Sequence, residues 1–544
     1  MKIQVIRKIL LIIIATVMAT MNAQAQYEGL FPRRMGCTGH LGGAQETRSD
    51  NPNTALCPMK DWDASREYRQ LVILLEFSDS TFSCENPREY YDRLFNEQGY
   101  NEGVGPGCVA DYFREQSGGL CNLKFDIMGP YKVSEAAKKK GSYIYGEKAI
   151  SEGIDMLIAD RPDMDYKIYD WDGDGNIEQV VIIFASYTGN DVTGFIWPNT
   201  GYIGKEVTEG MSIINSSCSC ELWEKGYGCG IGTICHEYSH CLGLPDVYPT
   251  GYSKYFSICD EFDLMDGGNY TNWGWCPPNL TAMEKMYLNW ATPVELDATT
   301  TISNLPSISD GGTSYLIRHT DTEYLLLENR QRKGWDAAIP GSGLIVTHID
   351  YNEADWLDNR INNKETHFGY DIVHADNMNY NDWDKLYPHE KGEKQYVDQE
   401  QFLYNRHLST SPYPWYDSAT ETENDCLTDT SVPTVVMFND NAEGSKQFGK
   451  SITNIRVADD GTVSFDFTME TTGIREALLQ DDGQRSKVEG QRDSVEGRRS
   501  KVKGRRSKVK GQCESWFTID GRRLAYKPSQ PGIYLYKRKK IMYP

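Results

Sequence analysis

Beyond its first 25 residues, the 544-residue sequence lacks any long run of apolar residues. The one such run, Ile9–Ala19, is too short to span a bilayer as a helix. It follows three basic residues and precedes Ala23-Gln24-Ala25, an order typical of a cleaved signal peptide. No stop-transfer pattern or lipobox-type cysteine comes next. We therefore expect residues 1–25 to be a signal peptide, and no integral membrane segment to remain after its removal.

The main part of the chain also lacks an excess of basic over acidic residues. The whole sequence has a net charge of −22, but residues 26–472 carry −36, which +11 over residues 473–544 and +3 in the signal peptide partly offset. A protein that binds nucleic acid needs the opposite sign to neutralise phosphates. The composition therefore argues against nucleic acid as a partner.

Histidine is scarce, with nine residues, whereas cysteine is not. The hydrophobic content of 39% and the charged content of 25% are typical of globular proteins, which excludes disordered and fibrous classes. All fourteen cysteines follow the signal peptide, in a chain that we expect to enter an oxidising compartment. The sequence therefore predicts several disulfides without specifying their pairing.

Periodicity divides the chain into a domain of mixed helices and strands and a second domain rich in strands, which together predict an α+β protein. In the first domain, short apolar runs predict strands at Leu71–Phe77, Leu123–Ile127 and Gln179–Ala185. Apolar residues three and four apart predict helices at Pro87–Asn96, Val109–Gln116 and Glu147–Asp160. In the second domain, short alternating runs predict strands at Tyr324–Leu327, Gly343–Ile349, Thr434–Phe438 and Thr462–Phe467.

Changes in local composition along the sequence also predict where the segments begin and end. Between 483 and 511, glycine recurs every seven residues within a polar, basic repeat that is too polar to bury a core. The predicted order is a signal peptide (1–25), a short leader or pro-segment (26–69), the first domain (70–291), the β-rich domain (292–471), a basic repeat linker (472–512) and a small C-terminal β unit (513–544).

The stretch from Gly230 to Asp246 is the most informative about chemistry, because it contains His236-Glu237-Tyr238-Ser239-His240. Residues four apart share one face of a helix, so His236 and His240 can bind one zinc ion, with Glu237 beside the water that zinc activates. Two ordinary histidines on a helix are the alternative interpretation. The residues that follow favour the metal site, because they extend the motif.

Gly243 stands where a glycine in the left-handed conformation would end this helix. Asp246 then falls where extended zincin motifs place their third metal ligand. The remaining alternatives for that ligand are Asp260, Glu261 and Asp263.

A methionine follows in a glycine-rich turn, Asp263–Gly268. Met265 in this turn resembles the Met-turn residue beneath the metal of metzincins, although a methionine near glycines usually serves packing. Tyr270 is a candidate for stabilising the oxyanion of a tetrahedral intermediate, although buried tyrosines also usually serve packing.

A second metal site is predicted just before the strand at Gln179–Ala185. Oxygen-bearing side chains alternate there around a glycine turn, as in the first part of an EF-hand loop: Asp170, Asp172, Asp174, Asn176 and Glu178. The twelfth position would be Val181 rather than glutamate, which excludes a complete EF-hand. We expect a structural calcium loop that takes its last ligands from elsewhere; the alternative is an aspartate-rich turn that needs no ion.

These motifs, together with Tyr324–Gln331, Gly334-Trp335-Asp336 and Pro340–Asp350, resemble the immune inhibitor A family of secreted zinc metalloendopeptidases over roughly residues 70–470. The resemblance implies a zincin-type catalytic domain with a β-rich domain packed on it. It also implies hydrolysis of peptide bonds in protein or peptide substrates, with Glu237 as the general base and zinc held by His236, His240 and Asp246.

The C-terminal segment resembles another known unit. Ile519–Leu524, Pro531–Tyr536 and Lys539-Lys540-Ile541 are similar to the C-terminal sorting domain of the type IX secretion pathway. This resemblance implies that the export machinery of a Gram-negative bacterium carries the protein through the periplasm to the cell surface or the medium.

A function from another class competes with the peptidase. A cell-surface binding or adhesion protein could use a zincin fold as a scaffold, with the β-rich domain recognising its target. The sequence favours the enzyme, because a scaffold has no need of His236, Glu237 and His240 together.

Overall fold

The computed structural model describes residues 61–469 except 104, 138–145, 188–195, 197, 224–227, 252–256, 380–407 and 418–421, together with four short strands between residues 516 and 543. The predicted signal peptide, most of the predicted leader and the predicted repeat linker lie outside the described residues. Within this described part, no helix combines the length and the apolar character needed to cross a membrane.

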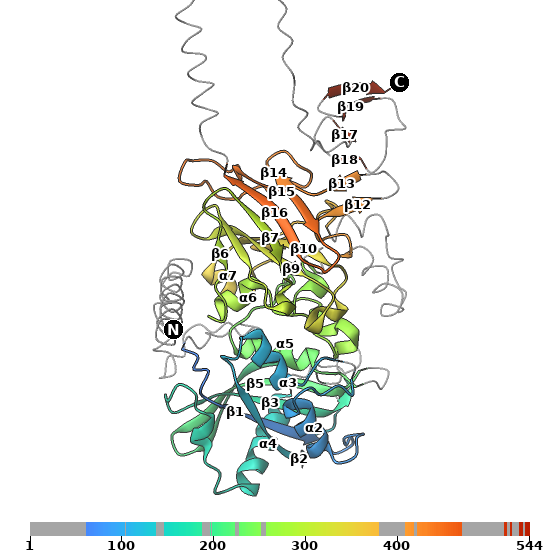
Figure 1. Cartoon of the computed structure of the whole chain (residues 1–544). Helices are drawn as coiled ribbons and strands as arrows, with labels where there is room; N and C mark the ends of the chain where they lie inside the picture. Colours follow the sequence, from blue (N-terminus) through green and yellow to red (C-terminus); the bar gives the residue numbers. More distant parts are fainter. Residues whose placement is uncertain are drawn as a thin grey trace, which may run out of the picture.

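A five-stranded mixed sheet forms the base of the first domain, in the order β2-β1-β3-β5-β4 (Figure 1). Its strands are β1 (Tyr68–Glu76), β2 (Leu123–Lys132), β3 (Ile177–Tyr187), β4 (Asn199–Thr208) and β5 (Met211–Leu222). The first four in the order are parallel, and β4 runs antiparallel to β5 at the edge. The three strands predicted in this domain coincide with β1, β2 and β3.

Helices cover both faces of this sheet. The predicted helices occur with the predicted bounds, as α2 (Pro87–Asn96), α3 (Val109–Gln116) and α4 (Glu147–Asp160). On β1, Val72 and Leu74 face the core shared with α2, α3 and α5 (Gly232–Cys241), whereas the alternate residues face the core shared with α4. This alternation explains why β1 and β3 are continuous apolar runs: both faces of the sheet are buried.

The second domain contains two further sheets. One has the order β11-β10-β9-β8-β6 and the other the order β14-β15-β16-β7. The strands of the first are β6 (Val294–Glu295), β8 (Tyr315–Arg318), β9 (Glu323–Arg330), β10 (Gly343–Asp350) and β11 (Tyr370–Ile372). Those of the second are β7 (Thr300–Leu305), β14 (Leu427–Thr428), β15 (Lys450–Val457) and β16 (Val463–Met469).

Short elements complete this part of the chain. Two helices are α6 (Ala282–Tyr287) and α7 (Glu353–Leu357), and β12 (Trp415–Asp417) pairs with β13 (Thr422–Asn424). Short 3-10 segments lie at Tyr166–Tyr169, Asp260–Phe262, Ile308–Asp310 and Gly334–Ala338. A longer one at Gly268–Gly274 is interrupted by a kink.

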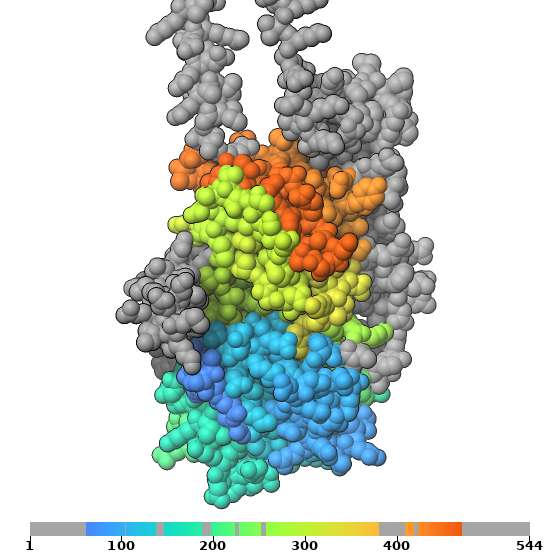
Figure 2. Space-filling view, in the orientation of Figure 1, coloured from blue at the N-terminus to red at the C-terminus, as the bar shows by residue number. Residues whose placement is uncertain are grey.

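Strand β9 joins the two domains because it is buried on both faces. Leu325 and Leu327 pack between the two sheets of the second domain, whereas Tyr324 and Leu326 belong to the core that contains α5. At its end, Arg330 donates two hydrogen bonds to Asp336, at 2.7 and 2.6 Å, and both residues are buried. The two lobes therefore stack on a shared core (Figure 2). Helix α5 lies between them (Figure 1).

One predicted strand is wrong. Thr434–Phe438 alternates as predicted, with Val435 and Met437 buried and Val436 exposed, but it is not a strand. The backbone amide of Phe438 donates instead to the Glu323 carboxylate, at 2.7 Å. A side chain thus takes the place of a neighbouring strand, which the alternating pattern cannot reveal.

The predicted C-terminal β unit is built of strands in its described residues. A four-stranded antiparallel sheet has the order β18-β17-β19-β20. Its strands are β17 (Trp516–Thr518), β18 (Arg523–Leu524), β19 (Gly532–Tyr536) and β20 (Lys539–Tyr543). The whole protein belongs to the α+β class, as predicted.

The predicted disulfides are not seen among eight of the described cysteines. Their thiols are free, and seven of the eight are buried: Cys84, Cys108, Cys121, Cys229, Cys235, Cys241, Cys259 and Cys276. Buried cysteine behaves as a small apolar residue, and Cys235 packs in this way on the inner face of α5. Their number in the sequence therefore reflects core packing at several positions.

Candidate metal centre

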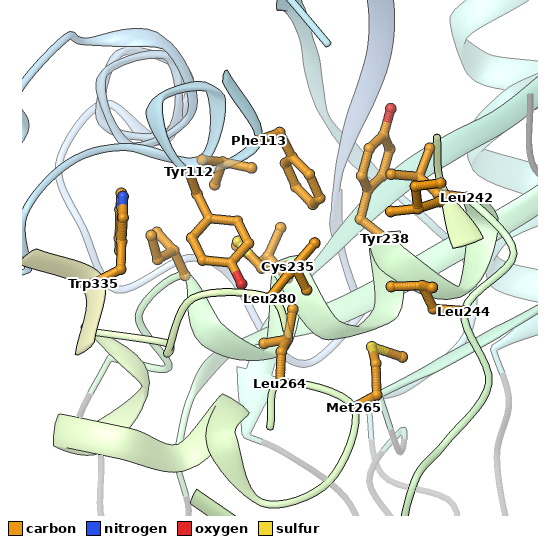
Figure 3. Packing of buried hydrophobic residues seen from close by; sticks show 14 of the residues in the cluster. Tyr112, Phe113, Cys235, Tyr238, Leu242, Leu244, Leu264, Met265, Leu280 and Trp335 are labelled. Atoms are coloured by element: carbon orange, nitrogen blue, oxygen red, sulfur yellow. The ribbon is translucent and has the colours of Figure 1, made fainter. Parts of the chain in front are cut away.

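Helix α5 holds the predicted motif between the sheet and the second domain. Every residue of the helix is buried. The Tyr238 hydroxyl donates to Gln70 Oε1 on β1 at 2.9 Å, and Gln179 on β3 donates to the same oxygen at 2.8 Å. Cys235, Tyr238 and Leu242 pack with Tyr112 and Phe113 of α3 (Figure 3). The helix is therefore fixed on its inner face, and its opposite face is free to present polar groups.

Gly243 ends α5 as the sequence predicts. Its φ of 104° lies in the region that favours glycine. The amide of Gly243 donates to His240 O at 2.9 Å, and the amide of Leu244 donates to Ser239 O at 3.1 Å. These two bonds form a Schellman motif, which satisfies the last carbonyls of the helix. The chain then turns back over the helix face that carries the two histidines.

Both histidines are oriented by backbone carbonyls. His236 Nδ1 donates to Leu264 O at 2.8 Å, and His240 Nδ1 donates to Leu244 O at 2.7 Å. A carbonyl oxygen can only accept, so the proton of each neutral ring lies on Nδ1 and the lone pair on Nε2. This is the tautomer that metal-binding histidines adopt when their second nitrogen is hydrogen-bonded.

Asp246 completes a group of three possible ligands. Its Oδ1 lies 3.2 Å from Nε2 of His236 and 3.2 Å from Nε2 of His240. The side chain is 1% exposed, and Oδ1 is a buried oxygen without a hydrogen-bond partner. One ligand atom from each of the three residues lies within 4.8 Å of the others. Two imidazole nitrogens and one orphaned carboxylate oxygen are a donor set that fits zinc.

The charges at this site favour a cation. Burial opposes protonation of His236, but the nearby carboxylates of Asp246 and Glu237 raise its pKa to about 9. Burial also opposes ionisation of Asp246, yet His240 and His236 hold the pKa of that carboxyl well below its usual range. The arrangement therefore stabilises positive charge among these groups, whether from a proton or from a metal ion.

Glu237 is held by a residue that the sequence did not single out. Thr200 Oγ1, on β4, lies 2.6 Å from Glu237 O and 3.0 Å from Glu237 Oε2. Burial raises the pKa of the Glu237 carboxyl, and the neighbouring His236 and His240 counteract part of that shift. A carboxylate with a raised pKa is suited to accept a proton near neutral pH.

Two tyrosines are influenced by the charges of the same cluster. Desolvation raises the pKa of Tyr270, and the charges of Glu237 and Asp246 add to the shift, although 45% of the residue surface is exposed. Tyr248 was not predicted as a site residue. Burial raises its pKa well above the usual range, as do the charges of Asp246 and Glu237. Its position two residues after the third ligand is the local signal that could have found it.

Met265 lies in a buried turn, as the sequence predicts. Its amide donates to Asp263 Oδ1 at 2.7 Å, and its carbonyl accepts from Val247 N at 2.8 Å. Its side chain is fully buried in the cluster that includes Leu244 and Leu264 (Figure 3). Leu264, the residue before Met265, accepts the hydrogen bond from His236 through its carbonyl. This turn therefore supports one of the histidine ligands.

The alternative third ligands lie apart from the histidines. Asp263 Oδ1 accepts from the Met265 amide. Asp260 and Glu261 belong to the 3-10 turn that precedes it. The candidate metal group among the described residues that includes these histidines contains Asp246 and none of the three alternatives.

The acidic loop brings three of its predicted ligands together. Carboxylate oxygens of Asp170, Asp172 and Asp174 lie within 4.8 Å of one another. The Asn176 side chain donates to Asp174 within the loop, at 3.3 Å. Glu178 Oε1 accepts from the amides of Trp171 and Asp172, at 2.9 and 3.2 Å. The last two predicted residues therefore close the loop rather than join the three carboxylates.

Comparison with known proteins connects this geometry to a family. Residues 63–292 match the sequence profile described as immune inhibitor A peptidase M6, catalytic domain. This part of the chain matches the peptidase domain of the immune inhibitor A family. The matched range comprises the first sheet, α5, Asp246 and Met265. The predicted resemblance is therefore confirmed for this domain, and it supports a hydrolase of the metalloprotease type.

Two similar proteins extend the comparison. The pre-pro-metalloprotease PrtV of Vibrio cholerae serotype O1 is 25% identical over 261 residues, which cover 41% of this chain and 28% of that protein. Immune inhibitor A of Bacillus thuringiensis subsp. alesti is 25% identical over 298 residues, which cover 43% of this chain and 42% of that protein. The chain thus spans less than half the length of either relative in these matches.

Proposed function

We propose that the protein is an exported zinc-dependent endopeptidase that hydrolyses peptide bonds in protein substrates. The observation that carries the proposal is the convergence of His236 Nε2, His240 Nε2 and Asp246 Oδ1, a buried carboxylate oxygen without a hydrogen-bond partner. The peptidase family match supports the reaction class. A binding protein built on the same scaffold, the alternative function, gives no reason for a buried, unpaired carboxylate oxygen.

The chemistry divides between the ion and the chain. When bound, zinc supplies a Lewis acid that polarises the substrate carbonyl and makes a water molecule more acidic. Glu237 takes the proton of the attacking water and returns it to the leaving amine, because its carboxylate lies beside the three ligands. Thr200 restrains Glu237 through its contacts with Oε2 and the backbone carbonyl.

We propose that Tyr248 and Tyr270 assist the oxyanion. Phenols with raised pKa values remain protonated at neutral pH and can donate hydrogen bonds. Tyr270 lies in 268–274, a segment that packs on α5. We assign these residues to binding the substrate carbonyl, with Glu237 as the proton carrier.

Metal removal tests the proposed activity directly. The purified full chain should cleave casein, lose this activity after dialysis against a chelator and recover it when zinc is restored in stoichiometric amount. Zinc content by elemental analysis should rise and fall with activity. Cleavage that persists in fully zinc-depleted protein would contradict the proposal, as would zinc-loaded protein that cleaves none of a broad peptide library.

We further propose that the acidic loop at 170–178 binds calcium. Burial, together with the charges of Asp172 and Asp170, raises the pKa of Glu178 from 4.5 to about 8. The folded state therefore binds this proton more tightly than the unfolded state does. Protonation of Glu178 stabilises the fold below its unfolded pKa, and this stabilisation is lost as pH rises through about 8. A calcium ion would replace the proton as the positive charge.

The calcium proposal predicts a pH-dependent stabilisation. In EGTA, the melting temperature should fall between pH 5 and pH 8, and added calcium should raise it mainly at pH 8. Glu178→Gln should reduce the fall in EGTA, because its amide does not titrate. Asp172→Ala combined with Asp174→Ala should abolish the calcium effect while zinc content stays unchanged. Equal melting curves in calcium and EGTA at pH 8 would show that the loop is an aspartate-rich turn that binds no calcium.

Export follows from the two ends of the sequence and from the family. The resemblance to a family of secreted peptidases supports an extracellular site of action. We propose that the signal peptide directs the chain to the periplasm and that the β17–β20 unit is the address for the second step. Protein substrates and this export machinery are the proposed partners.

A further inference from the structure

A segment of the second domain covers the chain that leaves α5. Trp356, Asn359 and Asn362 are spaced three residues apart, and all three are buried. Trp356 Nε1 donates to Gly243 O at 3.2 Å, and Asn362 Nδ2 donates to Val247 O at 2.7 Å. These two contacts flank Asp246 along the sequence. All three residues lie beyond the segment that matches the catalytic domain, which ends at 292.

Asn359 contacts the candidate third ligand itself. Its Nδ2 donates to Asp246 Oδ2 at 2.7 Å, and its Oδ1 accepts from the Asp246 backbone amide at 2.6 Å. One side-chain amide thus holds both the carboxylate and the main chain of the same residue. Because Oδ2 is engaged by Asn359, the other oxygen, Oδ1, is the one directed at the two histidines.

The backbone of Asn359 is fixed as firmly as its side chain. Its φ is 53°, in the left-handed region that asparagine tolerates better than most residues. Its carbonyl accepts from the Thr250 hydroxyl, and its amide donates to Trp356 O at 3.2 Å. The residue is fully buried. A short amide side chain on a left-handed backbone is what this contact requires, since glutamine would be one carbon too long and aspartate would lack the donor.

We infer that Asn359 is a positioning residue of the metal centre, and that the second domain therefore completes the metal site of the first. This inference rests on the proposed zinc-dependent function. Hydrogen-bond partners of metal ligands fix ligand orientation, and their removal typically weakens metal affinity by about 10- to 100-fold. Loss of the Asn359 amide frees the Asp246 carboxylate to rotate, so that Oδ1 no longer converges on the same point as the histidine nitrogens.

Two substitutions in the full chain test this role. Asn359→Gly keeps the left-handed backbone and removes only the side-chain amide. Asn359→Asp keeps the shape but places a carboxylate against Asp246 Oδ2. The matched control is Asn362→Asp, because Asn362 lies on the same segment and donates to Val247 O and Tyr370 O without touching a ligand.

The readout is zinc affinity, measured by competition with a chromophoric chelator at a temperature at which circular dichroism shows each variant folded. We expect both Asn359 variants to bind zinc about 10- to 100-fold more weakly than the parent, and the absorption spectrum of the cobalt-substituted protein to change. Asn362→Asp should lower the melting temperature while its zinc affinity and cobalt spectrum stay those of the parent. A merely structural contact would give the same result at both positions.

The outcomes separate this inference from the proposed function. Parent-like zinc affinity and cobalt spectrum in folded Asn359→Gly would overturn the positioning role while leaving a zinc peptidase intact. A parent protein that binds no zinc would overturn the proposed function itself. Should Asn359→Asp fail to fold, Asn359→Gly alone decides. A further measurement needs no variant. Zinc removal from the parent should raise the rate of hydrogen exchange at the Asp246 amide, because zinc binding by Asp246 and the hydrogen bonds between Asp246 and Asn359 stabilise each other.

Discussion

Glu237→Gln should remain folded and bind zinc normally, but lose about 10²- to 10⁴-fold in kcat/KM on a peptide substrate. Glutamine has nearly the shape of glutamate, and its side-chain oxygen can still accept the bond from Thr200 Oγ1, which lies 3.0 Å from Glu237 Oε2. The ligands are untouched, since the metal group consists of His236, His240 and Asp246. Only the proton acceptor is removed. Kinetics on a fluorogenic peptide, with zinc content measured on the same sample, checks the expectation.

A second variant provides the control for this result. His236→Ala should lose both zinc and activity, because two protein ligands rarely hold a catalytic zinc ion. The pair therefore separates loss of the base from loss of the metal. Retention by zinc-loaded Glu237→Gln of more than about a tenth of the parent activity would assign the proton transfer to another group.

The parts of the site that the sequence predicts are those encoded within one helix and its end. The i, i+4 spacing of His236 and His240 places them on one face wherever the helix lies. Gly243 ends the helix because its φ of 104° is one that other residues avoid. The role of Asp246 as the third ligand is predicted from its distance in sequence beyond the end of the helix. Each of these predictions needs only local geometry, which is why the structure brings these three residues together.

The parts that the sequence could not predict depend on pairing between distant segments. Thr200 reaches Glu237 because β4 pairs with β5 in a register that sets Thr200 opposite Ser217. Asn359 reaches Asp246 across 113 residues of sequence. Neither residue type is unusual, and no local pattern marks either position. The supporting contacts of a metal ligand therefore emerge only from the tertiary structure.

The wrong strand at Thr434–Phe438 has the same cause. The segment does alternate between buried and exposed residues, but alternation reports side-chain burial and not backbone hydrogen bonding. Glu323 accepts from the amides of Phe438 and Asn439, at 2.7 and 2.9 Å, and thereby replaces a partner strand. A buried carboxylate that satisfies backbone amides is invisible to periodicity.

Removal of residues 513–544 should leave a folded, active peptidase that stays in the periplasm. A signal peptide carries a chain across the inner membrane, so passage through the outer membrane needs a second address that a receptor reads. Strands β17–β20 pair only with one another among the described strands, so the unit can be removed without taking a strand from another sheet. The candidate metal group at 236–246 and Asn359, which contacts it, include no residue of this unit. Activity should therefore survive while location changes.

The basic repeat before the C-terminal β unit provides a site at which the unit can be cleaved off after export. Residues 483–512 contain eleven arginines and lysines, and such polar stretches are preferred sites of cleavage. The extracellular form should therefore lack peptides from beyond about residue 473. Cell fractionation with mass spectrometry measures both effects, and a chain with one heptad deleted, which should still be exported, is the control. Recovery of Gly532–Lys537 from extracellular protein at full stoichiometry would make the C-terminal sheet a permanent domain, because an address that is read and removed cannot remain on the exported product.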